Sequence, residues 1–156
     1  MKKVMIMVIV GILTILVTVP AMAQNYVEVN TGNITANGII TDLPTMGFSV
    51  GCRKENVGIE VSVNETGYIS DALIKLNEID VKVIGYHDFN KMITGFIGVG
   101  VGAGTLTIGD SRNREINGVG TVGVQINITE KVSLTMKSMG TSSNLGTISL
   151  GITMKF

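Results

Sequence analysis

The chain of 156 residues carries 12 basic and 12 acidic residues, 45% hydrophobic residues and 20 glycines. Charged residues make up 15% of the chain, against about 25% in typical soluble domains. Without a clustered basic face this composition gives no support to nucleic-acid binding, and the single cysteine, Cys52, excludes an internal disulfide.

The N-terminal segment, residues 1–23, has the features of a secretory signal peptide. Its start is basic, Val4 to Val19 is almost wholly apolar, and Pro20 to Ala23 ends in a small-x-small pattern. The apolar run falls short of the ~20 residues that a spanning helix needs, which argues against an uncleaved anchor. We therefore expect cleavage after Ala23 and export. The remaining 156 − 23 = 133 residues, 24–156, suffice for one domain.

Eight segments of the mature chain alternate between apolar and polar or small residues, as strands with two different faces do. Turns or loops are expected at 41–44, 54–56, 87–90, 109–114, 129–131 and 139–146. The stretch 65–76 leaves open a short helical turn or an extension of the next strand. In chain order, the expected strands are centred on residues 24–36, 45–53, 57–64, 79–86, 92–108, 121–128, 132–137 and 148–156.

The last segment, residues 148–156, shows the alternation most clearly. Its apolar face is formed by Ile148, Leu150, Ile152, Met154 and Phe156, and its other face by small residues and Lys155. Eight strands of about 10 residues, the length that crosses a bilayer at a tilt, use about 80 of the 133 residues. The sequence predicts an all-β fold, an eight-stranded antiparallel up-and-down transmembrane β-barrel.

The polar face is the expected inner face. It consists mostly of glycine, serine, threonine and asparagine, too poor in charge for a solvated exterior and small enough for a narrow lumen. Charges on this face must be paired to be tolerated, so we expect a salt-bridged interior, with a conducting channel as the alternative. The expected lumen charge set is Glu28, Arg53, Glu60, Asp80, Lys82, Lys137 and Lys155.

The second half of the chain resembles the small eight-stranded outer-membrane barrels of the OmpA-transmembrane, OmpX and opacity-protein type. The resemblance lies in the Gly-rich stretches 96–104 and 118–127, the turn and strand at 129–134, and a final strand that ends in phenylalanine. It implies insertion into the bacterial outer membrane, with lipid, lipopolysaccharide and the barrel-assembly machinery as partners. It also implies that Phe156 carries the assembly signal.

Four sequence features could indicate chemistry or binding. Gly118 to Gly123 matches a dinucleotide-binding string, but strand residues follow where a helix is required, so these glycines are expected to line the lumen. His87, the single histidine, is expected in a solvated turn and lacks a partner for metal binding or catalysis. Cys52 is expected on the lipid-facing side. The charged loop Asp110 to Glu115 is a candidate contact for lipopolysaccharide phosphates.

The sequence thus favours a monomeric outer-membrane barrel with a structural or surface-interaction role, without catalysis and without a cofactor. A soluble secreted or periplasmic barrel that binds a small apolar ligand is the alternative. A narrow ion pore and a lipid-modifying enzyme are weaker alternatives.

Overall fold

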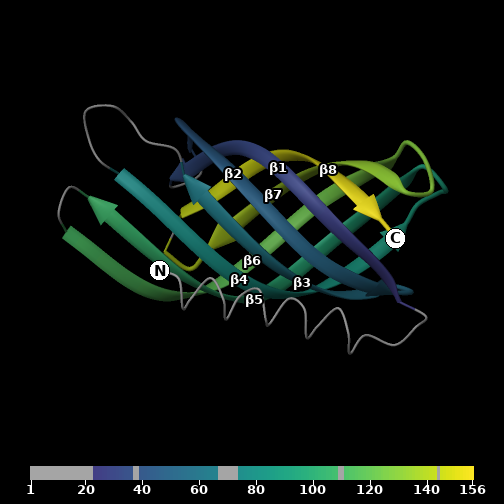
Figure 1. Ribbon diagram of the computed structural model, residues 1–156, viewed down its shortest axis with the longest axis horizontal. Helices are drawn as coiled ribbons and strands as arrows, with labels where there is room; N and C mark the ends of the chain where they lie inside the picture. The colour runs from purple at the N-terminus through teal and green to yellow at the C-terminus, as the bar shows by residue number, and fades with distance from the viewer. Residues whose placement is uncertain (1–22, 37–38, 67–73, 109–110, 144) are drawn as a thin grey trace.

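The computed structural model describes residues 23–36, 39–66, 74–108, 111–143 and 145–156. These residues form eight strands joined by short connections (Figure 1). The expected signal peptide lies almost wholly outside the described residues. The strands are β1 (Gln24–Ala36), β2 (Ile39–Lys54), β3 (Val57–Thr66), β4 (Ile74–Asp88), β5 (Ile93–Ile108), β6 (Ser111–Asn127), β7 (Val132–Thr141) and β8 (Leu145–Lys155).

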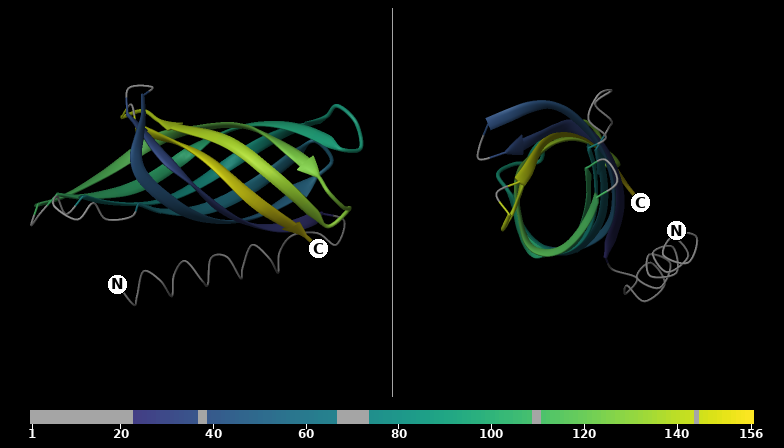
Figure 2. Two further views of the ribbon diagram at one scale, coloured as in Figure 1. Left: turned by 90° about the horizontal axis from the view of Figure 1, so that it is seen from above. Right: turned by 90° about the vertical axis from the view of Figure 1, so that its left-hand side faces the viewer.

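Each strand pairs antiparallel with the next, and β8 returns to pair with β1, so the sheet closes on itself. The closing seam runs from Tyr26 opposite Lys155 to Ala36 opposite Leu145. The end-on view in Figure 2 shows the resulting ring. The predicted all-β, eight-stranded up-and-down antiparallel barrel is therefore confirmed. No helix in the described part of the chain is long and apolar enough to cross a membrane.

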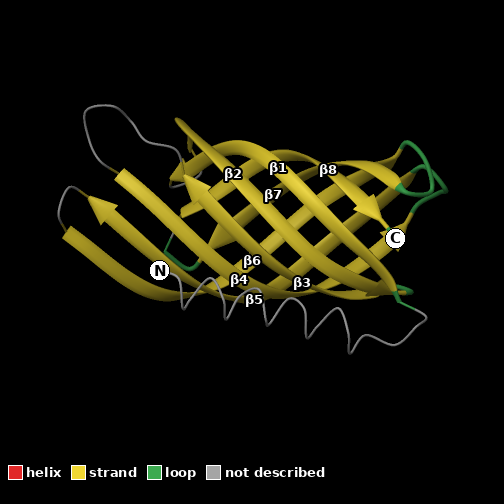
Figure 3. Ribbon diagram, in the orientation of Figure 1, coloured by secondary structure: helices red, strands yellow, loops and turns green. Residues whose placement is uncertain are grey.

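The three short turns lie at the same end of the barrel as the start of β1 and the end of β8 (Figure 3). They follow β2, β4 and β6. In the turn after β2, Glu55 adopts a positive φ of 53°. In the turn after β4, the side chain of Asn90 accepts hydrogen bonds from the backbone N–H groups of Met92 and Ile93. We call this end the turn end, and the other the far end.

The strands reach further toward the far end than the sequence pattern indicated. Residues 41–44, expected as a turn, lie within β2, because the pairing of β1 with β2 continues to Ala36 opposite Ile39 after a register shift between Asn33 and Thr35. Residues 111–114 of the expected polar loop belong to β6 and pair with β5. His87 is likewise a strand residue, opposite Gly95, and not a turn residue.

The two faces of the wall have opposite chemistry. Alternate residues point outward, and all eight strands contribute exposed apolar side chains to a belt around the barrel. The inward residues are polar, charged or glycine, and many of them are buried. The belt includes Val29, Met46, Phe48, Ile59, Val81, Val83, Ile97, Val99, Val101, Val122, Val124, Ile126, Leu134, Met136, Leu150, Ile152 and Met154.

Candidate functional site: a charge network inside the barrel

Lys82 is at the centre of a buried ionic cluster in the lumen. Its ammonium group lies 2.7 Å from Asp80 Oδ1 and 3.1 Å from Glu60 Oε1, and it donates a hydrogen bond of 2.6 Å to Ser62 Oγ. Only 1% of the Lys82 side chain is exposed. The pairing of β3 with β4 sets Glu60 directly opposite Lys82 and Ser62 opposite Asp80. The two strands thus bring the opposite charges together by register.

Lys137, from β7, extends the cluster across the lumen. Its Nζ lies 2.6 Å from Glu28 Oε1 on β1 and 3.8 Å from Glu60 Oε1 on β3. Glu60 therefore interacts with both lysines. Glu28 accepts further hydrogen bonds from Asn30 and Thr153. Because each ion has several partners, the network meets the condition under which charges are tolerated away from water.

An aromatic layer lies next to this network on the side of the turn end. The Tyr26 hydroxyl donates to Glu60 Oε2 at 2.8 Å, and the Tyr86 hydroxyl donates to that of Tyr26 at 3.1 Å. Tyr86 packs against Phe96 with ring centroids 6.1 Å apart, and both rings are buried. Charged and aromatic side chains together fill the middle of the lumen.

The structure brings five of the seven predicted lumen charges together: Glu28, Glu60, Asp80, Lys82 and Lys137. The other two lie at the turn end and outside this cluster. Arg53 forms an ion pair of 2.7 Å with Asp88 and stacks over the Tyr86 ring at 4.5 Å. Lys155 donates to Asn127 Oδ1 at 2.7 Å. Both occupy inward-facing positions of their strands, but they lie closer to the turn end of the barrel axis than the cluster does.

Three buried residues of the lumen were missed in the sequence, of which Ser62 and Asn30 belong to the network and Glu78 lies beyond it. Glu78, Ser62 and Asn30 are inward and buried, yet none was singled out. Glu78 could have been found by continuing the alternation of Asp80 and Lys82 two residues upstream. The hydroxyl groups carry no sequence signal of their own, because serine and threonine are common on the whole inner face.

The glycines of β5 make room for the network. Gly98, Gly100, Gly102 and Gly104 point inward between the long side chains of β4 and β6. A Cβ on Gly98 would meet Ile84 and Thr121, and one on Gly102 would meet Asp80, Glu78 and Val119. Side chains from both neighbouring strands thus lean over Gly98 and Gly102 and fill the volume beside them, so no open channel remains at that height.

This arrangement predicts opposite effects at two neighbouring glycines. A Cβ on Gly100 would overlap the Val81 carbonyl and the Lys82 backbone, whereas a Cβ on outward-facing Gly120 meets nothing within 4 Å. We expect Gly100→Ala to destabilise the barrel by about 1–3 kcal/mol, as overpacking does. Gly120→Ala should be neutral or stabilising by up to about 1 kcal/mol, because alanine loses less backbone entropy. Urea unfolding followed by circular dichroism measures both, and equal effects would contradict the packing described here.

His87, Cys52 and the glycine string are not part of this network. His87 is exposed and packs edge-on against Phe89, with ring centroids 4.8 Å apart. Gly118 and Gly120 face outward, so the expectation that they line the lumen was wrong, whereas Gly123 lies inward beneath Phe96. The strand β6 continues through the string without a helix. Cys52 is a free thiol at an outward-facing position of β2. Within the described residues no group of three or more His, Cys, Asp or Glu side chains is arranged to hold a metal ion.

Comparison with known proteins identifies the fold. At the level of sequence, neither a family model nor a curated protein matches the chain. Among solved structures, Neisserial surface protein A is similar with a TM-score of 0.66 and 16% identity, over 87% of this chain and 98% of that one.

Two further structures give the same result. The N-terminal β-barrel domain of Pseudomonas aeruginosa OprF has a TM-score of 0.68 and 15% identity, over 85% of this chain and 97% of that one. The Yersinia pestis attachment invasion locus protein Ail, in complex with the heparin analogue sucrose octasulfate, has a TM-score of 0.59 and 16% identity, over 86% and 98%. The resemblance to small eight-stranded outer-membrane barrels is thus confirmed, and in fold this chain is similar to them.

Proposed function

We propose that the protein is an integral outer-membrane β-barrel with a closed lumen and a structural or surface-interaction role. The observation that carries this proposal is the apolar belt on all eight strands around a polar, ion-paired interior. A water-soluble barrel has the reverse arrangement, whereas lipid-facing strands require an apolar exterior. The alternative, a soluble barrel for a small apolar ligand, lacks support because the middle of the lumen is charged and filled.

Export and insertion follow from this proposal. The signal-peptide features of residues 1–23 support passage across the inner membrane. The turn end would face the periplasm and the far end the cell exterior. The inferred role of Phe156 as an assembly signal stays a prediction. In the structure its backbone pairs with Asn25, and 65% of the residue is exposed.

Cell fractionation tests the location. We expect the protein in the detergent-solubilised outer-membrane fraction, with faster gel migration before boiling than after it, because a closed barrel resists detergent until heated. Because Cys52 is a free thiol, no disulfide within the chain contributes to this difference in migration. Recovery of the protein in the soluble periplasmic extract, with heat-independent migration, would refute membrane insertion.

The ion-paired lumen favours a role other than transport. An eight-stranded interior is just wide enough to be filled by side chains, and here the ion pairs of Lys82 and Lys137 involve four strands, β1, β3, β4 and β7. We therefore expect no stable conductance steps from the purified protein in planar bilayers. A Lys82→Met variant serves as the comparison, since it removes the central cation while leaving the wall intact. Stable single-channel steps from the unmodified protein would favour the narrow-pore alternative.

Lipid and lipopolysaccharide are the proposed partners. Arg112 and Arg114 lie on the outward parity of β6 near the far end, both exposed, above the exposed Ile116. Guanidinium groups at that height suit phosphate groups at the outer membrane surface. The phosphate contact predicted for residues 110–115 is thus kept as a proposal. Residues 111–115 belong to the strand β6, however, and not to a loop. We further propose that the barrel acts as a monomer.

We propose no catalytic role and no cofactor. A lipid-modifying enzyme would need a nucleophile, a base and an orienting carboxylate within hydrogen-bond reach. In the described part of the chain, the His87 side chain is engaged with the Phe89 ring and with no such group.

A further inference from the structure

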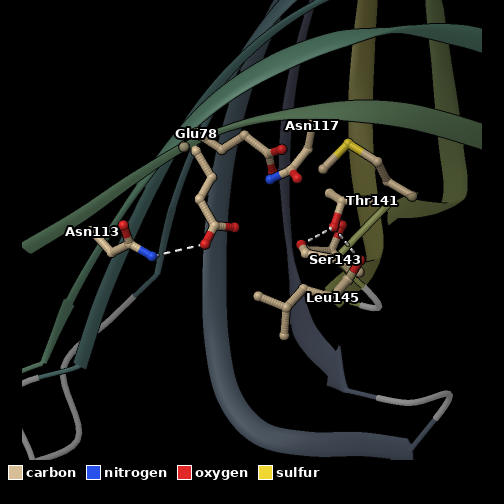
Figure 4. A pocket seen from close by; sticks show the side chains of 11 residues that line it. Glu78, Asn113, Asn117, Thr141, Ser143 and Leu145 are labelled. Atoms are coloured by element: carbon tan, nitrogen blue, oxygen red, sulfur yellow. Dashed lines mark hydrogen bonds between the residues drawn. The ribbon is translucent and has the colours of Figure 1, made fainter.

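A small cavity opens at the far end of the lumen, above the charge network (Figure 4). Its volume is about 40 Å³. Met139, whose sulfur lies 3.9 Å from Lys82 Nζ, separates it from the network below. The wall is formed by inward residues of β4 to β8, among them Glu78, Glu115, Asn117, Thr141 and Leu145.

Glu78 is the unusual member of this wall. The residue is 5% exposed, it lines the cavity, and no hydrogen bond or ion pair joins its carboxylate to another of the described residues. Its oxygens are not among the fully enclosed atoms without a partner, so they reach the cavity. Two of the polar side chains that line the cavity with it have partners elsewhere: Asn113 donates to Glu115, and Thr141 donates to the Leu145 carbonyl. A carboxylate that is largely withdrawn from water and has no protein partner is unfavourable. A cation in the cavity would supply the missing partner.

The strand register sets a second carboxylate in line with Glu78. Glu78 pairs with Gly104 of β5, and Gly104 pairs with Glu115 of β6, so the three residues form one row across three strands. Two strand spacings separate the two glutamate Cα atoms by about 10 Å. Because Gly104 between them has no side chain, the space between the carboxylates opens into the cavity. Glu78 is buried at one side of this row and Glu115 is exposed at the other.

The charges nearby also favour a cation. No lysine or arginine is among the residues that line the cavity. The cluster below it contains three carboxylates, of Glu28, Glu60 and Asp80, and two ammonium groups, of Lys82 and Lys137, so its formal charge is −3 + 2 = −1 before Glu78 is counted. The far end of the lumen therefore attracts positive charge.

The residues that line the cavity favour an organic cation over a metal ion. Metal sites for Ca²⁺ and Mg²⁺ use several oxygen ligands around one point, and the described residues contain no such group of three acidic side chains. Instead, Met139, Leu145 and Gly146 give the cavity an apolar wall beside the two carboxylates. A carbon chain with an ammonium group at each end matches an apolar wall with a carboxylate at each side.

We propose that this cavity is a binding site for small aliphatic diamines, with Glu78 binding the inner ammonium group and Glu115 the outer one. The proposal goes beyond the role of an outer-membrane barrel and depends on that role only for the side from which the ligand enters. Its test uses the folded barrel in detergent micelles, so it can fail while membrane insertion holds.

Titration calorimetry with 1,4-diaminobutane tests the site, with butane-1,4-diol as the uncharged probe and MgCl₂ as the metal probe. We expect the diamine to bind and the diol not to bind. Glu78→Gln should weaken diamine binding by about tenfold or more, the loss expected when a hydrogen bond between charged groups is removed. Glu130→Gln, in the exposed turn after β6, is the matched control and should leave the affinity unchanged.

Glu115→Gln keeps the test decisive if Glu78→Gln does not fold, because Glu115 is exposed and its replacement leaves the interior intact. It should weaken diamine binding without affecting 1-aminobutane. Absence of diamine binding to the unmodified barrel, or an unchanged affinity in both glutamate variants, would overturn the proposal. Magnesium that binds with the same dependence on Glu78 and displaces the diamine would overturn the assigned ligand class.

Discussion

Replacement of Lys82 by methionine is expected to lower the free energy of unfolding by about 3–5 kcal/mol, as the removal of one partner from a buried ion pair does. Methionine keeps most of the length and apolar character of the lysine stem but donates no hydrogen bond. Asp80 and Glu60 would then lose the ammonium group that lies 2.7 and 3.1 Å from them. Urea unfolding of the barrel in phospholipid vesicles, followed by far-ultraviolet circular dichroism, measures the change.

Two comparisons separate the lost ion pair from a general effect of losing a lysine. Lys131→Met, in the exposed turn after β6, should change stability by less than about 1 kcal/mol, as exposed charges do. The double variant Lys82→Met with Asp80→Asn removes one charge of each sign and should recover part of the loss. If Lys82→Met costs no more than Lys131→Met, the lumen is hydrated and the network is not what closes it.

The fold could be predicted because the period of two between apolar and polar residues specifies a face for each residue. Val99 and Val101 point outward, and Gly98 and Gly100 point inward, as the alternation requires. The number of strands follows from counting such segments. The same alternation explains why every member of the predicted lumen charge set occupies an inward-facing position.

The parity of a residue does not specify its height along the barrel, and this is why the predicted charge set divided into two groups. Height depends on register between strands, as in Glu60 opposite Lys82, and on contacts across the closed lumen. The ion pair of Glu28 with Lys137 joins β1 to β7, two strands that are not neighbours in the sheet. Such a contact exists only once the barrel closes, so it carries no local sequence signal. Arg53 and Lys155 share the parity but lie at the turn end.

The strand ends at the far end were the least predictable part of the fold. Turn-forming residue types, such as Asp42-Leu-Pro44 and Ser111-Arg-Asn113, suggested loops, yet these segments pair as strands. Pairing with a neighbouring strand satisfies their backbone groups and outweighs the local preference of the residues. The inward direction of Glu78 follows from the alternation, but its place in the cavity wall depends on the strand pairing at the far end.

Val99→Arg is expected to destabilise the barrel by about 2–4 kcal/mol in a bilayer, the cost of arginine on the lipid-facing side near the membrane midplane. Val99 is 67% exposed in the middle of the apolar belt. Ile128→Arg, in the turn after β6, is the matched control, and near the interface it should cost at most about 1 kcal/mol. Refolding yield into phospholipid vesicles and urea unfolding in those vesicles measure both variants. A water-soluble barrel would respond differently, because an exposed arginine on its surface would leave stability nearly unchanged at both positions. Equal, small effects at Val99 and Ile128 would therefore contradict lipid contact by the belt. A large effect at Val99 alone would show that the bilayer surrounds the middle of the strands.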